Sequence, residues 1–238
     1  MSKKIKFLIG LILFFVVIGF VFGTITLIRF YKLQTIWSKV NENVEKNNFN
    51  METIITNKGV TIKTKTYYKD GIGKFVSHDG TYIWFDGMKA YSVDEENKIA
   101  KSITDIESVA IPYKESFASL YPGYTFNFFE RLMLAGNIEN VIKTDYYNGE
   151  KVTFISIKNE EYTKSYWITK DFANLIKAEI RFSNGDVYEY KYDINFHTTK
   201  LKDVELPDFS DYTMQKNENS IEETRIDNVK QITENKSE

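Results

Sequence analysis

The sequence contains no cysteine, only 3 prolines and 12 glycines, and 2 histidines in 238 residues. Without cysteine there can be no disulfide framework, no thiolate metal site, no cysteine nucleophile and no lipid-modified N-terminal cysteine. Lys and Arg number 31 against 33 Asp and Glu, so nucleic acid is not an expected partner. The aromatic share of 16% is too high for a chain that is disordered throughout. Most of the chain should therefore fold.

One long apolar run stands near the beginning of the sequence. Phe7 to Ile28 is a stretch of 22 residues without a charge. As a helix that rises ~1.5 Å per residue, it spans the ~30 Å hydrocarbon layer of a bilayer. A cleaved signal peptide is the alternative, but its apolar region is shorter, about 7–15 residues, and ends in small residues. Because this run ends in Thr26, Leu27 and Ile28, we expect an uncleaved anchor.

The anchor divides the chain into parts that face different compartments. We expect a cytoplasmic leader over 1–6, the anchor over 7–29, an extracytoplasmic β domain over 30–214 and a polar C-terminal tail over 215–238. The flanking charges are nearly balanced, so the orientation depends on the short leader and on Phe30, Tyr31 and Trp37, which suit an outer interface. The part beyond Arg29 holds 33 acids against 27 bases. We therefore expect a single-pass cell-membrane protein with an acidic outer domain.

The residues after the anchor have helical periodicity from Leu33 to Asn47. The apolar positions on one face of this expected helix are Leu33, Ile36, Trp37, Val40 and Val44. Because these side chains are apolar, this face must be covered by other apolar residues. The helix either continues the anchor or is the first element of the domain, lying against a sheet.

Period-two alternation then predicts two meanders of antiparallel strands, with turns such as Asp70-Gly71 and Asn148-Gly149. The expected strands are Val60–Tyr68, Ile72–Ser77, Thr81–Phe85, Lys89–Val93, one that ends near Ile103, Ile138–Tyr147, Lys151–Ile157, Tyr162–Thr169, Ile176–Phe182 and Val187–Phe196. The fold class is therefore mainly β (α+β), with an N-terminal transmembrane helix before a curved antiparallel sheet.

The two meanders are separated by a segment in which Pro112, Pro122 and Gly123 break the pattern. A short helix is expected from Phe126 to Gly136, with Gly136 as its C-terminal cap. Its apolar face consists of Phe126, Phe129, Leu132 and Met133.

Residues that carry chemistry are scarce. His78 lies beside a turn and His197 at a strand end, and neither belongs to a catalytic motif. Phosphate-binding loops, zinc-protease motifs and nucleophile elbows do not occur in the sequence. Asp94, Glu95 and Glu96 lack the spacing of a calcium loop and suit a solvated turn. We therefore predict that the protein is not an enzyme and needs neither a metal nor a cofactor.

Three stretches resemble the LolA/LolB/RseB-like family of bacterial lipoprotein carriers and envelope sensors. DGTYIWFDGMKAYSVDEENKIA (Asp79–Ala100) looks like that family's D-G-x-x-hydrophobic-W stretch. ITKDFANLIKAEIRFSNGDVYEYKY (Ile168–Tyr192) and the closing ELPDFSDY (Glu205–Tyr212) are also similar. The order of elements agrees, and the resemblance covers roughly Leu33 to Tyr212.

The resemblance implies a half-barrel of antiparallel strands around short helices, with an apolar concavity that receives acyl chains or lipids in relatives. The candidate lining residues are Tyr68, Phe75, Trp84, Phe126, Phe129, Leu132, Phe154, Tyr166, Ile180 and Tyr190. Two functions remain open. In one, the module holds a lipid, an acyl chain or a lipidated peptide. In the other, these side chains fill a closed core and the protein is an envelope sensor or structural subunit that docks on a protein partner.

Overall fold

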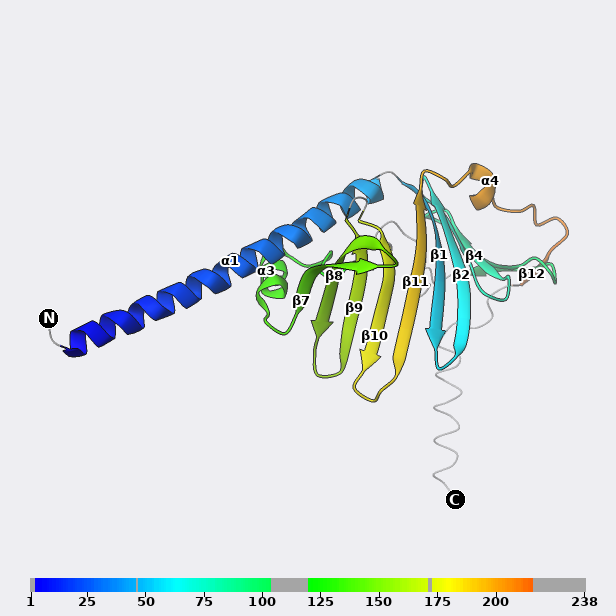
Figure 1. The fold of residues 1–238 in the computed structure, drawn as a ribbon. Helices are drawn as coiled ribbons and strands as arrows, with labels where there is room; N and C mark the ends of the chain where they lie inside the picture. Colours follow the sequence, from blue (N-terminus) through cyan, green and yellow to red (C-terminus); the bar gives the residue numbers. More distant parts are fainter. Residues whose placement is uncertain (1–2, 46, 104–119, 171–172, 216–238) are drawn as a thin grey trace, which may run out of the picture.

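The computed structural model describes residues 3–45, 47–103, 120–170 and 173–215 (Figure 1). Helix α1 (Lys3–Glu45) leads into a 12-stranded sheet, which two short helices accompany, α3 (Phe128–Gly136) and α4 (Leu201–Val204). The strands are β1 (Asn48–Asn57), β2 (Val60–Lys69), β3 (Ile72–Val76), β4 (Tyr82–Phe85), β5 (Ala90–Asp94), β6 (Ile99–Ile103), β7 (Val141–Tyr147), β8 (Glu150–Lys158), β9 (Tyr162–Thr169), β10 (Leu175–Phe182), β11 (Val187–Phe196) and β12 (Thr213–Gln215). The expected break at Pro112 and all but the first residue of the expected tail lie outside the described residues.

Helix α1 unites the two helical patterns of the sequence in a single element of 43 residues. It can run uninterrupted because no proline occurs before Pro112. The part before Ile28 projects from the domain with its apolar side chains exposed, whereas Leu33, Ile36, Trp37 and Val40 are buried. By length and composition α1 can cross a membrane, a property that a signal sequence shares.

The sheet joins both meanders at its centre. The strand order is β12-β6-β5-β4-β3-β2-β1-β11-β10-β9-β8-β7. Strand β1 pairs antiparallel with both β2 and β11, so residues about 145 positions apart, such as Phe49 and Phe196, lie side by side. Every pair is antiparallel except β12 with β6. This confirms the expected fold class.

Two-residue turns fix the register of several hairpins. Asp70 and Gly71 both have positive φ angles, 51° and 91°, as do Asn148 and Gly149, 51° and 82°. Left-handed values at both turn positions define the turn whose twist matches that of the flanking strands. Glycine supplies the second position because it lacks the Cβ that makes this conformation costly.

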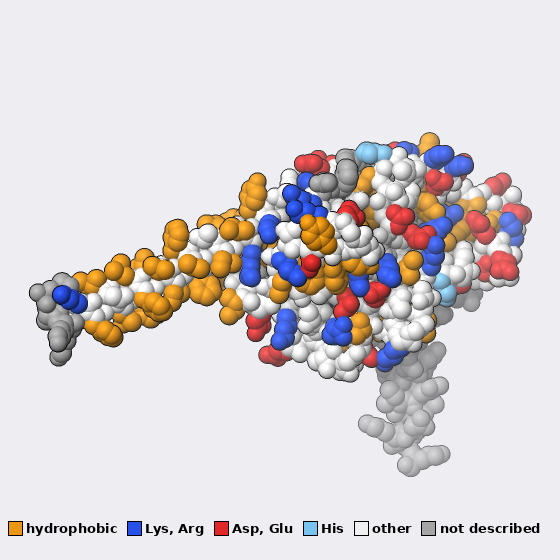
Figure 2. Space-filling view, in the orientation of Figure 1, with side chains coloured by type: hydrophobic (Ala, Val, Ile, Leu, Met, Phe, Trp, Pro, Cys, Tyr) orange, Lys and Arg blue, Asp and Glu red, His pale blue; other side chains and the backbone are white. Residues whose placement is uncertain are grey.

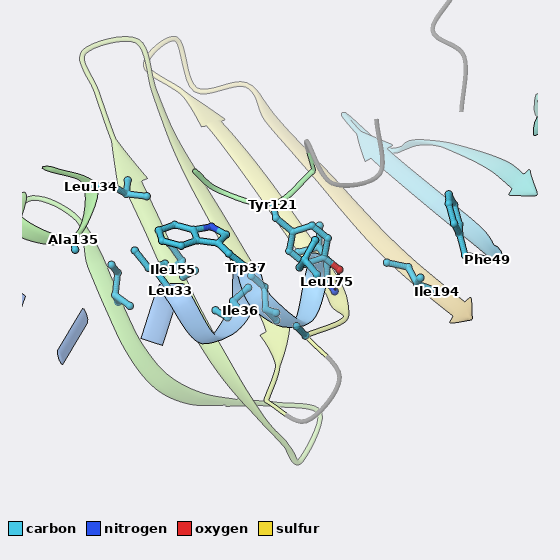
Figure 3. Packing of buried hydrophobic residues seen from close by; sticks show 14 of the residues in the cluster. Leu33, Ile36, Trp37, Phe49, Tyr121, Leu134, Ala135, Ile155, Leu175 and Ile194 are labelled. Atoms are coloured by element: carbon cyan, nitrogen blue, oxygen red, sulfur yellow. Dashed lines mark hydrogen bonds between the residues drawn. The ribbon is translucent and has the colours of Figure 1, made fainter. Parts of the chain in front are cut away.

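The main hydrophobic core lies between α1 and one face of the sheet, which we call the inner face. Leu33, Ile36 and Trp37 of α1 pack with Ile155 of β8 and Leu175 of β10 (Figure 3). Each large apolar side chain that is fully buried contributes about 1.5–3 kcal/mol relative to exposure. The expected helical face after the anchor therefore packs on the sheet while it also continues the anchor helix.

A second cluster lies on the opposite, outer face of the sheet. Tyr82, Trp84 and Val93 are buried there under the segment from α4 to β12, residues 201–215, which we call the strap. The indole nitrogen of Trp84 donates a hydrogen bond of 2.7 Å to the carbonyl oxygen of Val204. Helix α4 thus lies on the outer face, and not on the inner face with the other helices.

Helix α3 differs from its expectation in two details. The sequence predicted Gly136 as the cap, but Gly136 is the last helical residue, and Asn137 follows it in an extended conformation. The side chains that α3 buries are Leu134 and Ala135, whereas Phe129 and Met133 are 75% and 74% exposed. The expected apolar face therefore points mainly away from the core.

Candidate ligand-binding site

A groove of about 810 Å³ opens where α1 meets the sheet, between α1, α3 and β8. It is lined by Thr26, Phe126, Glu130, Leu132, Met133, Leu134, Gly136, Asn137, Ile138, Asn140, Ile157 and Lys158. Most of these side chains are apolar, and the volume lies within the range of about 300–1,000 Å³ that is typical of small-molecule sites. We call this cavity the α3 groove.

The start of α3 is held by polar contacts. Asn127 accepts a hydrogen bond from the Glu130 backbone nitrogen, and Glu130 accepts one from that of Asn127, which forms a capping box. Arg131 donates to the carbonyl oxygens of Gly123 and Tyr124, and its guanidinium lies 4.3 Å from the centre of the Trp37 ring. These contacts fix one end of α3 against α1.

The end of α3 is tied to both neighbouring elements. Asn140 is buried, donates a 3.0 Å hydrogen bond to the Leu134 carbonyl and accepts one of 3.4 Å from the Lys158 backbone nitrogen. Arg29 of α1 donates to the Asn137 carbonyl at 3.3 Å. Because buried polar groups that lose their partners are costly, this arrangement holds the groove walls in place.

The groove combines an apolar floor with a polar rim. Leu132, Leu134 and Ile157 lie among the lining residues, and Lys158 and Glu130 provide charges of opposite sign. Such a site can shield an apolar chain from water while Lys158 attracts an anionic headgroup. It offers no nucleophile beside a base, and the described residues contain no group of three or more His, Asp or Glu side chains that could hold a metal ion.

A smaller hollow of about 250 Å³ lies elsewhere on the inner face, along β10 and β11. Ile180, Tyr188 and Tyr190 line it, and Tyr190 stacks on Tyr192 with ring centres 6.4 Å apart. Burial raises the pKa of Tyr190 and of Tyr192, and it raises the pKa of Tyr166 to about 12. The shifts reflect how far the sheet covers these phenols, of which Tyr190 lines the hollow.

The structure distributes the ten predicted lining residues over four places. Phe126 and Leu132 line the α3 groove, and Phe129 lies on the exposed side of α3. Ile180 and Tyr190 line the smaller hollow, and Tyr68, Phe75 and Tyr166 share the inner face with them. Trp84 and Phe154 are on the outer face, Trp84 under the strap and Phe154 against Trp167 with ring centres 5.1 Å apart. The last two cannot share a cavity with the others.

Sequence reasoning missed several residues that shape the α3 groove. Thr26 was assigned to the anchor, and Ile138 to a strand that in fact begins at Val141. Ile157 was predicted only as the last residue of a strand and Lys158 as the residue after it, so neither was named as a candidate lining residue. The signal in the sequence was Ile138 itself, an isolated apolar residue between Asn137 and Glu139 just after the expected helix. In the structure it is 75% exposed.

Comparison with family models and with curated proteins finds no match. Among solved structures, an uncharacterized conserved protein from Thermus thermophilus is similar, with 7% identity and a TM-score of 0.47 over 77% of this chain and 98% of that one. The Pseudomonas aeruginosa MucA/MucB complex contains a chain with 11% identity and a TM-score of 0.40, over 72% of this chain and 61% of that one. A LolA superfamily protein from Nitrosomonas europaea has 11% identity and a TM-score of 0.28, over 72% and 96%.

These likenesses concern the fold alone. At these identities and TM-scores they carry no conclusion about the site.

Proposed function

We propose that this protein is a membrane-anchored, extracytoplasmic binding module that holds the acyl chain of a lipid or lipidated peptide in the α3 groove. The observation that carries the proposal is the position of the groove. An apolar cavity of about 810 Å³ opens beside Thr26, at the end of the apolar part of α1. A chain that leaves the bilayer beside the anchor would enter the groove with little exposure to water.

The proposal that α1 anchors the protein in a membrane is supported by the exposure of its apolar side chains. Its apolar window is not buried in the domain, and side chains such as Phe14, Phe15 and Phe20 are more than half exposed (Figure 2). Large contiguous apolar surfaces are rare on water-soluble monomers. We assign the N-terminus to the cytoplasm and the β domain to the outside, on the short leader and the aromatic residues Phe30, Tyr31 and Trp37 described above.

The ligand half is supported by the lining of the groove. Burial of one CH₂ group stabilises a complex by about 0.8 kcal/mol before the costs of association, so an acyl chain of ordinary length gains enough to bind. Lys158 at the rim suits a carboxylate or phosphate headgroup. A tethered module cannot ferry its cargo across an envelope, so we assign it to holding or presenting a ligand.

Native mass spectrometry of the full-length chain, released from detergent micelles, tests this proposal. We expect an acyl-bearing species at near one-to-one ratio, identified after solvent extraction. Ile138→Glu places a charge at the mouth of the groove and should remove the ligand. Val60→Glu is the matched control, because Val60 is similarly exposed, at 64%, but lies on the β1–β2 hairpin.

A clean ligand-free mass, even after incubation with fatty acids and phospholipids, would overturn the proposal. It would favour the second candidate, an envelope sensor or structural subunit that docks on a protein partner. The observation in favour of that candidate is the filled inner face near α1, where Trp37 and Tyr121 close the core. Reproducible recovery of one envelope protein with the tagged chain would then be the expected result.

A further inference from the structure

Exposed apolar side chains are concentrated in one short stretch of the domain. Beyond Tyr31, the described residues with large exposed hydrophobic side chains are Val60, Met88, Phe126, Phe128, Phe129, Met133, Ile138, Val141, Tyr146, Phe182, Leu201 and Met214. Half of them fall between Phe126 and Val141, and the others are scattered. Single exposed apolar residues are ordinary, but a contiguous group marks an interaction surface. We call Phe128 and Phe129 the α3 ridge; Met133 and Ile138 lie beside them and also line the α3 groove.

Helix α3 carries little charge of its own. It contains two ionisable side chains, Glu130 and Arg131. The exposed Glu130 carboxylate accepts a 2.7 Å hydrogen bond from the Asn127 backbone, and Arg131 turns toward Tyr124 and Trp37. Both charges are thus held by contacts at the start of the helix, and its other large exposed side chains, Phe128, Phe129 and Met133, are apolar.

Helix α3 lies directly against the end of the apolar part of α1 (Figure 1). The rings of Phe128 and Phe30 are 5.5 Å apart, and a Cβ on Gly136 would lie 3.5 Å from the methyl group of Thr26. Arg29 donates to the Asn137 carbonyl. The α3 ridge is therefore level with residues 26–30 of α1.

The length of the anchor determines how deep the α3 ridge would lie in a bilayer. The 22 residues from Phe7 to Ile28 are ~33 Å long as a helix, against a hydrocarbon layer of ~30 Å. A bilayer placed on this segment has its outer boundary near Ile28. Amphipathic helices that lie at such a boundary bury their apolar face ~5–10 Å deep, and α3 lies at the level of this boundary.

We propose that the α3 ridge inserts into the outer interface of the same bilayer that α1 crosses, so that the domain is docked on the membrane and the α3 groove opens toward lipid. This inference depends on the proposed anchoring of α1. The occupant is the bilayer, because the ridge continues the exposed apolar surface of the anchor. The tether removes most of the entropic cost of association, so a nine-residue helix suffices.

The absence of cysteine allows a site-specific test in the full-length chain, reconstituted in phosphatidylcholine vesicles. Single Phe128→Cys and Phe129→Cys variants carry an environment-sensitive nitrobenzoxadiazole label. Phe15→Cys reports on the anchor. Met88→Cys is the matched control, because Met88 is 79% exposed, against 60% and 75% for Phe128 and Phe129, but lies away from α1.

We expect labels at Phe128 and Phe129 to emit at shorter wavelength than the label at Met88, and to be quenched by nitroxide-bearing lipids but not by aqueous iodide. An anchor label that is buried in lipid, together with α3 labels that behave like Met88, would overturn this inference and leave the anchoring intact. If iodide also quenches the label at Phe15, both the anchoring of α1 and the insertion of the ridge are overturned. Loss of the groove ligand alone would leave the labels unchanged, which separates the two proposals.

Discussion

Lys177 links charged and aromatic side chains on the outer face of the sheet. Its ammonium group forms ion pairs with Glu189 on β11 and, at 3.8 Å, with Glu179 on β10. The same group lies 5.0 Å from the centre of the Trp167 ring. The hydrogen bond from Lys177 holds the pKa of Glu189 below its ordinary value of 4.5. Glu189 is therefore more acidic in the folded chain than in the unfolded chain.

This difference predicts a pH-dependent part of the stability. A carboxylate with a lowered folded-state pKa stabilises the fold above its unfolded value and loses that contribution as the pH falls. Because the ion pair is partly exposed, we expect Glu189→Gln to lower the free energy of unfolding by about 0.5 kcal/mol at pH 7. The free energy of unfolding should then fall less steeply between about pH 6 and pH 3 than it does in the native chain. Urea unfolding, followed by tryptophan fluorescence, measures both effects.

Glu150→Gln is the control for this prediction, since Glu150 is an exposed carboxylate on the β7–β8 turn. The free energy of unfolding of this variant should depend on pH as that of the native chain does. If Glu189→Gln loses stability with falling pH as steeply as the native chain, the Lys177 contact does not carry the effect.

A buried hydrogen bond ties the strap to the outer face of the sheet. Trp84 donates to the Val204 carbonyl, and Phe209 packs on Tyr91 and Tyr212 with ring centres 5.2 and 5.3 Å away. Trp84 is 5% exposed, so the loss of its indole N–H leaves a buried carbonyl without this donor. The Trp84 hydrogen bond and the aromatic contacts of Phe209 together hold the strap on the outer face.

Trp84→Phe should loosen the strap without unfolding the sheet. An unsatisfied buried carbonyl costs about 1–3 kcal/mol, which corresponds to roughly 5- to 150-fold faster exchange through local opening. Amide hydrogen exchange of residues 201–215 measures this change. Trp167→Phe, on the same face away from the strap, is the matched control. Equal protection of the strap in both variants would contradict the role assigned to Trp84.

The sequence predicted the ranges of individual helices and strands well, but not which of them lie next to each other. Most strand ranges were recovered to within two residues, because hairpin turns such as Asp70-Gly71 carry their own conformational signal. The pairing of β1 with β11 has no local signal, since it joins residues about 145 positions apart. The face of α3 that is buried likewise depends on where α1 passes.

The candidate site was only partly predictable for the same reason. Ile180 and Tyr190 share the inner face because alternation fixes side-chain direction along a strand. Trp84 looked equally suitable, because apolar residues mark a covered face without telling which face it is. Only the strap, which approaches from residues 201–215, shows that Trp84 is covered from the outer side.

The whole molecule combines an apolar helix, a groove beside it and an exposed ridge at one level of α1. In the proposed arrangement, α1 fixes the distance of the domain from the membrane, the ridge fixes its tilt, and the groove lies beside both. Each feature is ordinary in isolation. Their common position predicts that an acyl chain passes from the bilayer into the groove beside Thr26.

Photocrosslinking in nanodiscs tests this central claim most directly. The full-length chain is exposed to a fatty acid with a photoreactive group at the end of its acyl chain, and labelled peptides are mapped by mass spectrometry. The account predicts labels on Leu134 and Ile157, which line the groove, and their loss in Ile138→Glu but not in Val60→Glu. Labels confined to Phe7–Ile28 and the α3 ridge, with Ile157 unlabelled, would contradict it.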